Sequence, residues 1–339
     1  MTWTQSELPV IAAPMAGGAT TPALVAAAAD AGGFGFLAGG YKTPDAVAAE
    51  MAGLVGAGVA FGVNLFVPGG PSITSADFRR YAEELADEGQ PYGLDLATAP
   101  LVDDDDHWQA KLDLLVQDPV PFVSFTFGLP APSEIAVLRR AGSQVFATVT
   151  TAAEARNAEA SGVDGLIVQS TEAGGHSGTH TPDQPVPAVP LPELVRQLKG
   201  ATNLPLIAAG GIGDPMRVRE VLRAGASAAM IGTLLLRTDE SGTSEVHREA
   251  IAAAGPDQTV ITRAFTGRPA RGIRNGFITR HEATAPLGYP AIHHLTRPLR
   301  AAATAARNPD QVHLWAGTAY RQARPVRATD VITELATAL

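Results

Sequence analysis

Short runs of consecutive apolar residues recur along the chain, separated by longer segments in which apolar residues have helical spacing. The short runs have the length of a strand, and apolar residues do not alternate with polar ones within them. Continuous apolar runs of this kind predict parallel strands that are covered on both faces. Eight such runs are present: Val10–Met15, Gly33–Ala38, Ala60–Leu65, Phe122–Phe127, Val145–Val149, Gly165–Gln169, Pro205–Ala209 and Ala228–Gly232.

The segments between these runs carry start and stop signals for helices. Thr21-Pro22 and Asp214-Pro215 each combine a capping side chain with a proline at the first helical position. Gly32 and Gly225 follow the expected last turns of these two helices. Strands that alternate with helices form a parallel sheet, and eight strands can close it into a barrel. We therefore expect an α/β fold, a TIM (β/α)₈ barrel, with an open doubly wound sheet as the alternative.

One long region lacks the repeat of strand and helix. Residues 236–310 are rich in Arg, Gly and His, and we interpret them as an inserted, smaller and mainly helical subdomain that covers the mouth of the barrel. Residues 1–235 and 311–339 then form the barrel itself. The acidic run Asp103–Asp106 is typical of a solvated helix start and is a weak candidate for a metal site.

Composition narrows the classes of function. The chain has no cysteine, which excludes disulfides, thiolate metal sites and a cysteine nucleophile. Its net charge of −9, without a basic block, argues against a nucleic-acid partner. The start Met1–Val10 has no signal-peptide pattern, and no apolar stretch is long enough to span a bilayer. We expect a cytoplasmic protein without membrane contact, and whether it forms a homodimer is left open.

The carboxyl ends of the strands are where barrel enzymes place their chemistry. The seventh strand ends at Gly210-Gly211, and the eighth ends at Gly232-Thr233. Backbone amides at glycines can approach an anion closely, and the loops after these two strands often bind phosphate. The amino end of the helix at Asp214 lies nearby in sequence. These features predict a phosphate site.

The sixth strand ends in a glycine-rich loop that contains a histidine. Gln169 is placed to hydrogen-bond the edge of a heterocycle, and Gly174-Gly175 permits close approach of a ligand. His176 follows in a polar stretch with no apolar pattern that would explain it as a core residue. A histidine at this face suits a general acid or base, because its pKa lies near neutrality. A metal site formed by His176 and His180 is disfavoured because no carboxylate accompanies them, so no metal is predicted.

Two other strand ends offer contacts for a flat ring. The first strand ends at Ala13-Pro14-Met15, where a methionine can pack on a ring while backbone groups bond its edge. Asn64 ends the third strand and can hydrogen-bond the same ligand. Core packing at Met15 and strand capping at Asn64 remain the alternatives.

Taken together, these motifs resemble the nitronate monooxygenases, formerly called 2-nitropropane dioxygenases. The resemblance runs from residue 9 to about residue 320. Ser170 stands where that family often has Gly, and Thr318 stands where Gln is common. The segments that carry the resemblance are Ala13–Met15, Gly62–Asn64, Gln169–Gly178, Ala208–Ile212, Ile231–Thr233 and Leu314–Gly317.

The resemblance implies a flavoprotein that binds FMN in a barrel with a smaller helical domain. It also implies oxidation of alkyl nitronates, and in some cases nitroalkanes, by O₂ to a carbonyl compound and nitrite. His176 matches the catalytic histidine. The positions that match FMN contacts are Met15, Asn64, Gln169, Gly174, Gly211, Gly232 and Thr233.

Three other functions remain open at this stage. An FMN-dependent enoyl-thioester reductase shares this type of histidine loop and would use NAD(P)H. A non-catalytic FMN-binding barrel and a metal-dependent aldolase-type barrel are weaker alternatives. The roles of the arginines between Arg263 and Arg274, which could attract anions, and of His293 and His294 are also open.

Overall fold

The chain forms a closed barrel of eight parallel strands, which confirms the predicted fold class. The computed structural model describes residues 6–70 and 73–339. All eight predicted runs supply a barrel strand, and neighbouring strands pair in parallel register around the full circle. The barrel strands are β1 (Val10–Ala12), β2 (Phe34–Ala38), β3 (Gly62–Phe66), β4 (Phe122–Thr126), β5 (Gln144–Val149), β6 (Gly165–Gln169), β8 (Leu206–Ala209) and β9 (Ala228–Ile231).

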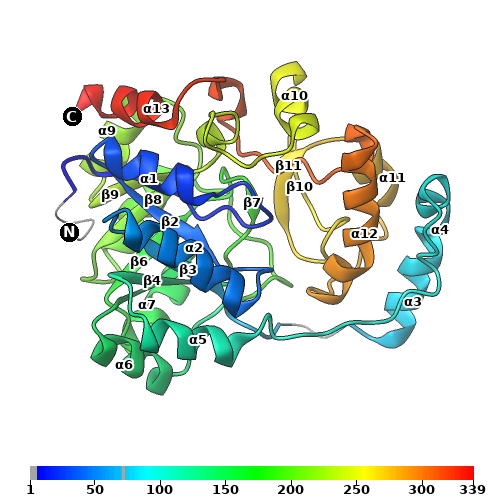
Figure 1. Cartoon of the computed structure of the whole chain (residues 1–339), viewed down its shortest axis with the longest axis horizontal. Coiled ribbons are helices and arrows are strands. Elements are labelled where there is room, and N and C mark those ends of the chain that lie inside the picture. Colours follow the sequence, from blue (N-terminus) through cyan, green and yellow to red (C-terminus); the bar gives the residue numbers. More distant parts are fainter. Residues whose placement is uncertain (1–5, 71–72) are drawn as a thin grey trace.

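Helices surround this barrel on its outer face (Figure 1). The predicted caps are present, since the Thr21 hydroxyl accepts from the Leu24 amide and the Asp214 carboxylate accepts from the Arg217 amide. The C-terminal helix packs against the first and the ninth helices and so completes the ring. The surrounding helices are α1 (Pro22–Asp30), α2 (Pro44–Gly56), α5 (Trp108–Gln117), α6 (Pro132–Ala141), α7 (Ala152–Ser161), α8 (Leu191–Lys199), α9 (Pro215–Arg223) and α13 (Ala328–Leu335).

The interior of the barrel is filled at its amino-terminal end. Phe34, Phe122 and Phe146 meet there edge to face with ring centroids 5.4–5.6 Å apart. Glycine is required beside them, because an added Cβ on Gly62 or Gly165 would stand 2.1–2.3 Å from a phenylalanine ring. This packed floor leaves space for a ligand only toward the carboxyl ends of the strands.

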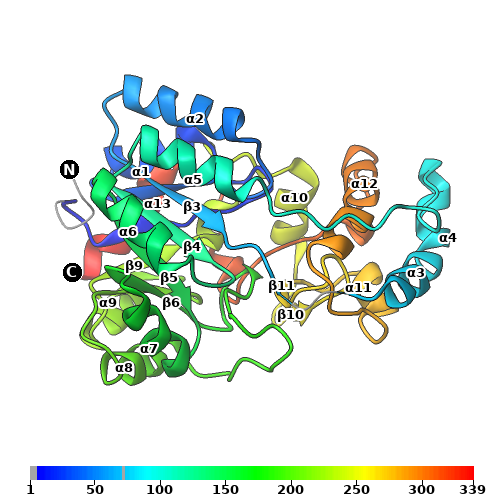
Figure 2. The ribbon, with the colours of Figure 1, turned by 90° about the horizontal axis from the view of Figure 1, so that it is seen from below.

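A smaller unit stands beside the barrel mouth (Figure 2). This unit contains the second sheet of the molecule, with the strand order β10-β11-β7, so the unit is not purely helical. The three strands are antiparallel, and the two-residue strand β7 belongs to the loop after β6. The elements of this unit are β7 (Gly175–His176), α10 (Glu245–Ala253), β10 (Thr259–Thr262), β11 (Ala270–Ile273), α11 (Gly276–His281) and α12 (Ala291–Ala305).

Two helices from the connection between β3 and α5 join this unit. They are α3 (Ser75–Glu84) and α4 (Ala86–Gly89), which the sequence prediction had placed with the barrel. Phe78 and Tyr81 share a buried cluster with Phe265, and the Tyr81 hydroxyl donates to the Ala264 carbonyl over 2.7 Å. Both views place α3 and α4 beside α11 and α12, away from the barrel (Figures 1 and 2).

The remaining regular elements are short 3₁₀ turns: η2 (Gln90–Tyr92), η3 (Thr233–Leu235), η4 (Pro309–Gln311), η5 (Tyr320–Gln322) and η6 (Ala336–Ala338). Among the helices of the described ranges, none combines the length and the apolar character that a bilayer crossing requires.

Candidate active site

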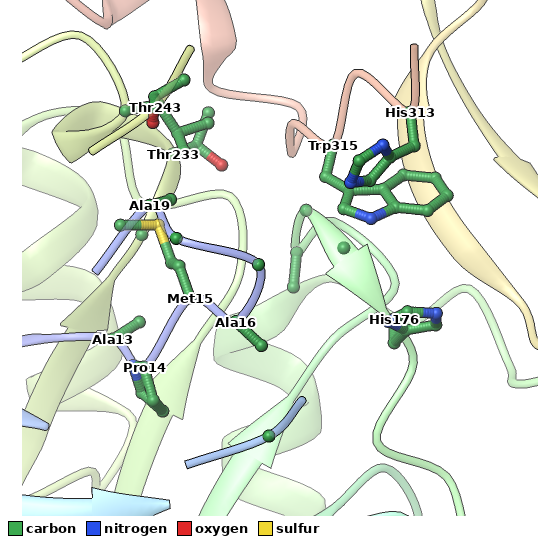
Figure 3. Close-up of a pocket in the computed structure, with 18 of the residues that line it drawn as sticks. Ala13, Pro14, Met15, Ala16, Ala19, His176, Thr233, Thr243, His313 and Trp315 are labelled. Atoms are coloured by element: carbon green, nitrogen blue, oxygen red, sulfur yellow. The ribbon is translucent and has the colours of Figure 1, made fainter. Parts of the chain in front are cut away.

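A cavity of about 730 Å³ lies at the carboxyl ends of the barrel strands, between them and the smaller unit. In Figure 3, Met15 and Thr233 approach it from one side, and His176, Trp315 and His313 approach from the other. Every residue predicted for the site lines this cavity: Ala13, Pro14, Met15, Asn64, Gln169, Gly174, Gly175, His176, Gly210, Gly211, Gly232 and Thr233.

The end of β1 is held in a tight turn by one buried threonine. The Thr20 hydroxyl accepts from the Met15 amide over 2.8 Å and donates to the Ala13 carbonyl over 3.2 Å. An added Cβ on Gly232 would stand 3.4 Å from the Met15 sulfur, so the ends of β1 and β9 adjoin. The turn therefore fixes the methionine at the wall of the cavity.

The loop after β8 depends on glycine at two successive positions. Gly210 and Gly211 have φ values of +115° and +65°, in the left-handed region that favours glycine. A Cβ on Gly210 would lie 2.6 Å from the Ser170 hydroxyl, and one on Gly211 would lie 2.9 Å from the Glu172 Cβ. The backbone of the β8 loop therefore packs directly against side chains of the β6 loop, and there is no space for a residue larger than glycine at position 210 or 211.

The end of β9 continues directly into η3. The Thr233 hydroxyl accepts from the Gly317 amide over 2.9 Å, which ties this end to the C-terminal segment. The amino end of α9, expected from sequence to contribute, is capped by its own Asp214. None of the described residues that line the cavity comes from α9.

Asn64 is buried at 3 % exposure and has a fixed carboxamide. Its Oδ1 accepts from the Ser124 hydroxyl over 2.8 Å and from the Thr126 hydroxyl over 3.0 Å. Because two hydroxyls hold the oxygen, Nδ2 is the group that Asn64 presents to the cavity.

Gln169 uses both ends of its carboxamide to hold the loop after β6. Its Nε2 donates to the His176 carbonyl over 3.1 Å, and its Oε1 accepts from the Gly178 amide over 2.7 Å. The sequence suggested a contact with a heterocycle edge. In the structure Gln169 lines the cavity, and its carboxamide fixes the backbone from His176 to Gly178.

Glu154 holds the far end of this loop, a role that its position at a helix start did not reveal. Its buried carboxylate accepts from the amide and hydroxyl of Thr150, from the Thr179 hydroxyl and from the His180 amide, over 2.6–2.9 Å. These hydrogen bonds lower the pKa of Glu154 although burial acts to raise it. The carboxylate is therefore a charged anchor for residues 179–180.

Arg268 holds the same loop from the smaller unit. Its guanidinium donates to the carbonyls of Ser177 and Thr179 and lies 4.0 Å from the centre of the Phe127 ring. The side chain is 2 % exposed. Arg271 likewise donates to the Thr171 carbonyl. Both arginines thus donate hydrogen bonds to backbone carbonyls of the loop after β6.

His176 lies in β7, paired with Ala270 of β11, so part of the predicted loop is a short strand. Its Nε2 is 2.9 Å from the Thr266 hydroxyl, which itself donates to the Arg268 carbonyl. While this hydroxyl donates to the Arg268 carbonyl, its oxygen accepts from Nε2–H, and the lone pair of the ring then lies on Nδ1. The rings of Phe127, Tyr289 and Trp315 surround it at 5.6–5.8 Å.

This environment keeps the imidazole of His176 uncharged. Burial, followed by the positive charges of Arg268 and Arg300, lowers its pKa to about 3. The ring can therefore accept a proton or a hydrogen bond at neutral pH. His180 is engaged elsewhere, since its Nε2 lies 3.0 Å from the Thr148 carbonyl. Within the described ranges, no three His, Cys, Asp or Glu side chains gather as a metal site.

The segment Trp315–Gly317 closes the site above the β6 loop. A Cβ on Gly174 would stand 2.5 Å from the Gly317 nitrogen, and one on Gly317 would stand 2.5 Å from the Glu172 carbonyl. The Thr318 amide donates to that same carbonyl over 3.0 Å. The two backbones thus touch directly, which explains why glycines occur at both positions.

Known proteins similar to this chain point to one family. A family model described as nitronate monooxygenase matches residues 2–338. A probable nitronate monooxygenase of Bacillus subtilis (strain 168) is 36% identical over 317 residues, which cover 92% of this chain and 90% of that protein. One from Staphylococcus aureus (strain MSSA476) is 33% identical over 334 residues, with 97% and 93% covered.

Solved structures of similar proteins are consistent with this family. The nitroalkane oxidase of Streptomyces ansochromogenes is 44% identical, with a TM-score of 0.93 over 99% of this chain and 96% of that one. FabK from Thermotoga maritima has a TM-score of 0.75 over 98% and 93% of the two chains. At 24% identity, that likeness shows the shared fold alone.

The contact of Gly174 with Gly317 leads to a test of stability. We expect Gly174→Ala to destabilise the protein by about 1–3 kcal/mol, because the new Cβ meets backbone that cannot rotate away. Gly53→Ala is the matched control: Gly53 lies in α2 with open space around it, so the change should stabilise by about 0.5–1 kcal/mol. Urea unfolding measures the free energy of unfolding of both variants and of the wild-type protein. Equal changes in the two variants would contradict the prediction.

Four neutral imidazoles beside the cavity predict loss of stability in acid. Burial is the largest cause of the lowered pKa of His176, His247, His293 and His313, with values of about 3 for His176 and about 4 for His247. The unfolded chain takes up these protons below about pH 6.5. Stability is therefore fully present above that pH and falls below it, by up to about 1.4 kcal/mol per pH unit for each group.

Unfolding free energies between pH 7.5 and 5 measure this slope. His247→Gln keeps a donor for the Trp315 carbonyl that His247 Nε2 faces over 3.1 Å, but removes one titrating group. Its slope should be shallower than that of the wild-type protein. Identical slopes, or stability that is independent of pH, would show that these imidazoles do not titrate as described.

Proposed function

This chain belongs to the nitronate monooxygenase family, and from that premise we propose that it oxidises alkyl nitronates with O₂ to a carbonyl compound and nitrite, using bound FMN. It is a flavin-dependent oxidoreductase by its family. The nitroalkane oxidase of similar structure supports a substrate of this type, either the nitronate or the neutral nitroalkane.

The cavity suits a flavin nucleotide. Its volume of about 730 Å³ falls within the range of small-molecule sites, about 300–1,000 Å³. Gly210, Gly211, Gly232 and Thr233 would hold the phosphate through backbone amides and one hydroxyl. The left-handed conformation of the first two glycines, and the β6 loop packed against them, exclude any larger residue at this end of the cavity.

The ends of β1, β3 and β6 would receive the ring system. Asn64 would donate through Nδ2, and Met15 with Ala13 and Pro14 would contact the flavin beside it. Gly174 and Gly175 allow close approach from the β6 loop. When bound, FMN would accept electrons from the substrate and pass them to O₂.

The observation that carries the proposal is the neutral His176 at the wall of this cavity. Its Nδ1 has a lone pair that can accept the α-proton of a neutral nitroalkane. A nitronate has already lost that proton and needs a donor. If the Thr266 hydroxyl rotates to donate to Nε2, the ring proton moves to Nδ1 and can donate to the anion. His176 would thus orient the anion or deprotonate its conjugate acid.

An absorbance experiment tests the proposal. The purified protein should show a flavin spectrum that bleaches when ethylnitronate is added without oxygen. Admission of air should restore the spectrum and produce nitrite. His176→Ala should lower turnover of nitroethane about 100-fold or more, within the usual range for loss of a general base. His294→Ala is the control, because His294 pairs with Asp104 and does not line the cavity.

Other outcomes would replace the proposal. A flavin that ignores nitronate but is bleached by NAD(P)H, with reduction of an enoyl thioester, would identify a reductase. A flavin that reduces readily without turnover of either substrate would identify a binding protein. Failure to bind FMN after its addition would remove the basis of the proposed chemistry.

A further inference from the structure

The charges that line the cavity are all positive. No Asp or Glu among the described residues contributes to its wall, whereas Lys42, Arg297 and Arg300 do. The whole chain has the opposite balance, with 34 acidic and 25 basic residues. A cleft lined by one sign of charge focuses the field and concentrates ligands of the opposite sign. The cavity is therefore built for an anion.

Only one of these three cations is buried. Lys42 is neutralised by Glu50 at 2.6 Å, and Arg297 is exposed to solvent. Arg300 is 5 % exposed, and no carboxylate in the described part of the chain forms an ion pair with it. Burial lowers its pKa to about 10, so the guanidinium remains charged at neutral pH. A buried charge without a counterion is costly, which marks Arg300 as a place for a ligand.

Hydrogen bonds within helix α12 fix the orientation of this guanidinium. Nε donates to the Thr296 hydroxyl over 3.1 Å, and Nη2 donates to the His293 carbonyl over 2.9 Å and to His293 Nδ1 over 3.2 Å. The described residues offer no hydrogen-bond acceptor to Nη1. Since Arg300 lines the cavity, Nη1 is the donor left for a ligand.

The surrounding rings bring Arg300 into the neighbourhood of His176. His293, which Arg300 holds, stacks on Tyr41 at 4.1 Å and lies 6.2 Å from Tyr289. Tyr289 in turn lies 5.8 Å from His176. The positive charge of Arg300 also contributes to the low pKa of His176. The two side chains therefore act on the same part of the cavity.

We propose that Arg300 is the anion-binding residue of this enzyme, with Nη1 donating to a nitronate oxygen, and that it makes the enzyme favour the anionic nitronate over the neutral nitroalkane. This inference rests on the proposed function for its substrate. Arg268 does not share the role, because it does not line the cavity and two of its three guanidinium nitrogens donate to the Ser177 and Thr179 carbonyls.

Two measurements on the FMN-loaded enzyme test the inference. The first is binding of inorganic nitrate, a planar anion with the same pair of oxygens, by calorimetry. Arg300→Gln should weaken nitrate binding about 10-fold or more, as expected for loss of a hydrogen bond to a charged group. The second is the KM for ethylnitronate, which should rise by a similar factor while the KM for nitroethane changes less than about threefold.

Arg274→Gln is the matched control, because it removes one positive charge from the same unit at an exposed position outside the cavity. It should leave both values nearly unchanged. Arg300→Met serves if the glutamine variant does not fold, since the flexible apolar chain of methionine brings no new polar group into this buried position. A crystal structure of the wild-type enzyme with nitrate shows directly whether the anion binds at Arg300, and it needs no variant.

Nitrate bound at Arg300 Nη1, with affinity lost in the Arg300 variants, supports the inference. Nitrate located elsewhere, or unchanged nitrate affinity and unchanged KM in a folded variant, overturns it. Failure of the proposed function looks different: the wild-type enzyme would not turn over ethylnitronate, while nitrate binding and its dependence on Arg300 would persist.

Discussion

The site depends on the close approach of one loop backbone to its neighbours. The loop after β6 contacts the Trp315–Gly317 segment at Gly174, and it contacts the β8 loop at Gly210 and Gly211. A Cβ added to any of these three glycines would lie only 2.5–2.9 Å from a neighbouring atom. Gln169 and Glu154 then fix the backbone that follows His176. Since these contacts leave the loop little freedom, the histidine has one position relative to the strand ends.

The two parts of the molecule contribute different chemistry to the cavity. The barrel supplies glycine backbone, small hydroxyls and the carboxamide of Asn64, which suit a phosphate and a polar ring edge. The smaller unit supplies an imidazole ring and positive charge, in particular His293, Arg297 and Arg300 of α12. Under the proposed function, FMN would therefore lie mainly against the barrel and the substrate against the smaller unit, and β7 places His176 at the boundary between them.

Sequence reasoning succeeded where the signal is local. Continuous apolar runs located all eight barrel strands, and the rule that chemistry follows the strand ends located residues that all line the cavity. It did not join α3 to the smaller unit, because the contact of Phe78 and Tyr81 with Phe265 links segments far apart in sequence. Arg300 was missed for the same reason: its spacing from His293 and Thr296 fits one helix face, but only packing shows that this face borders the cavity.

The charges at the site couple anion binding to proton transfer. Burial is the main cause of the low pKa of His176, and the positive charges of Arg268 and Arg300 lower it further. An anion bound at Arg300 would offset part of that positive charge and so raise the pKa of His176 toward its ordinary value. The imidazole would then hold a proton more readily when an anion is present than when the cavity is empty. A histidine that is neutral in the free enzyme can in this way become a better donor to the anion once it is bound.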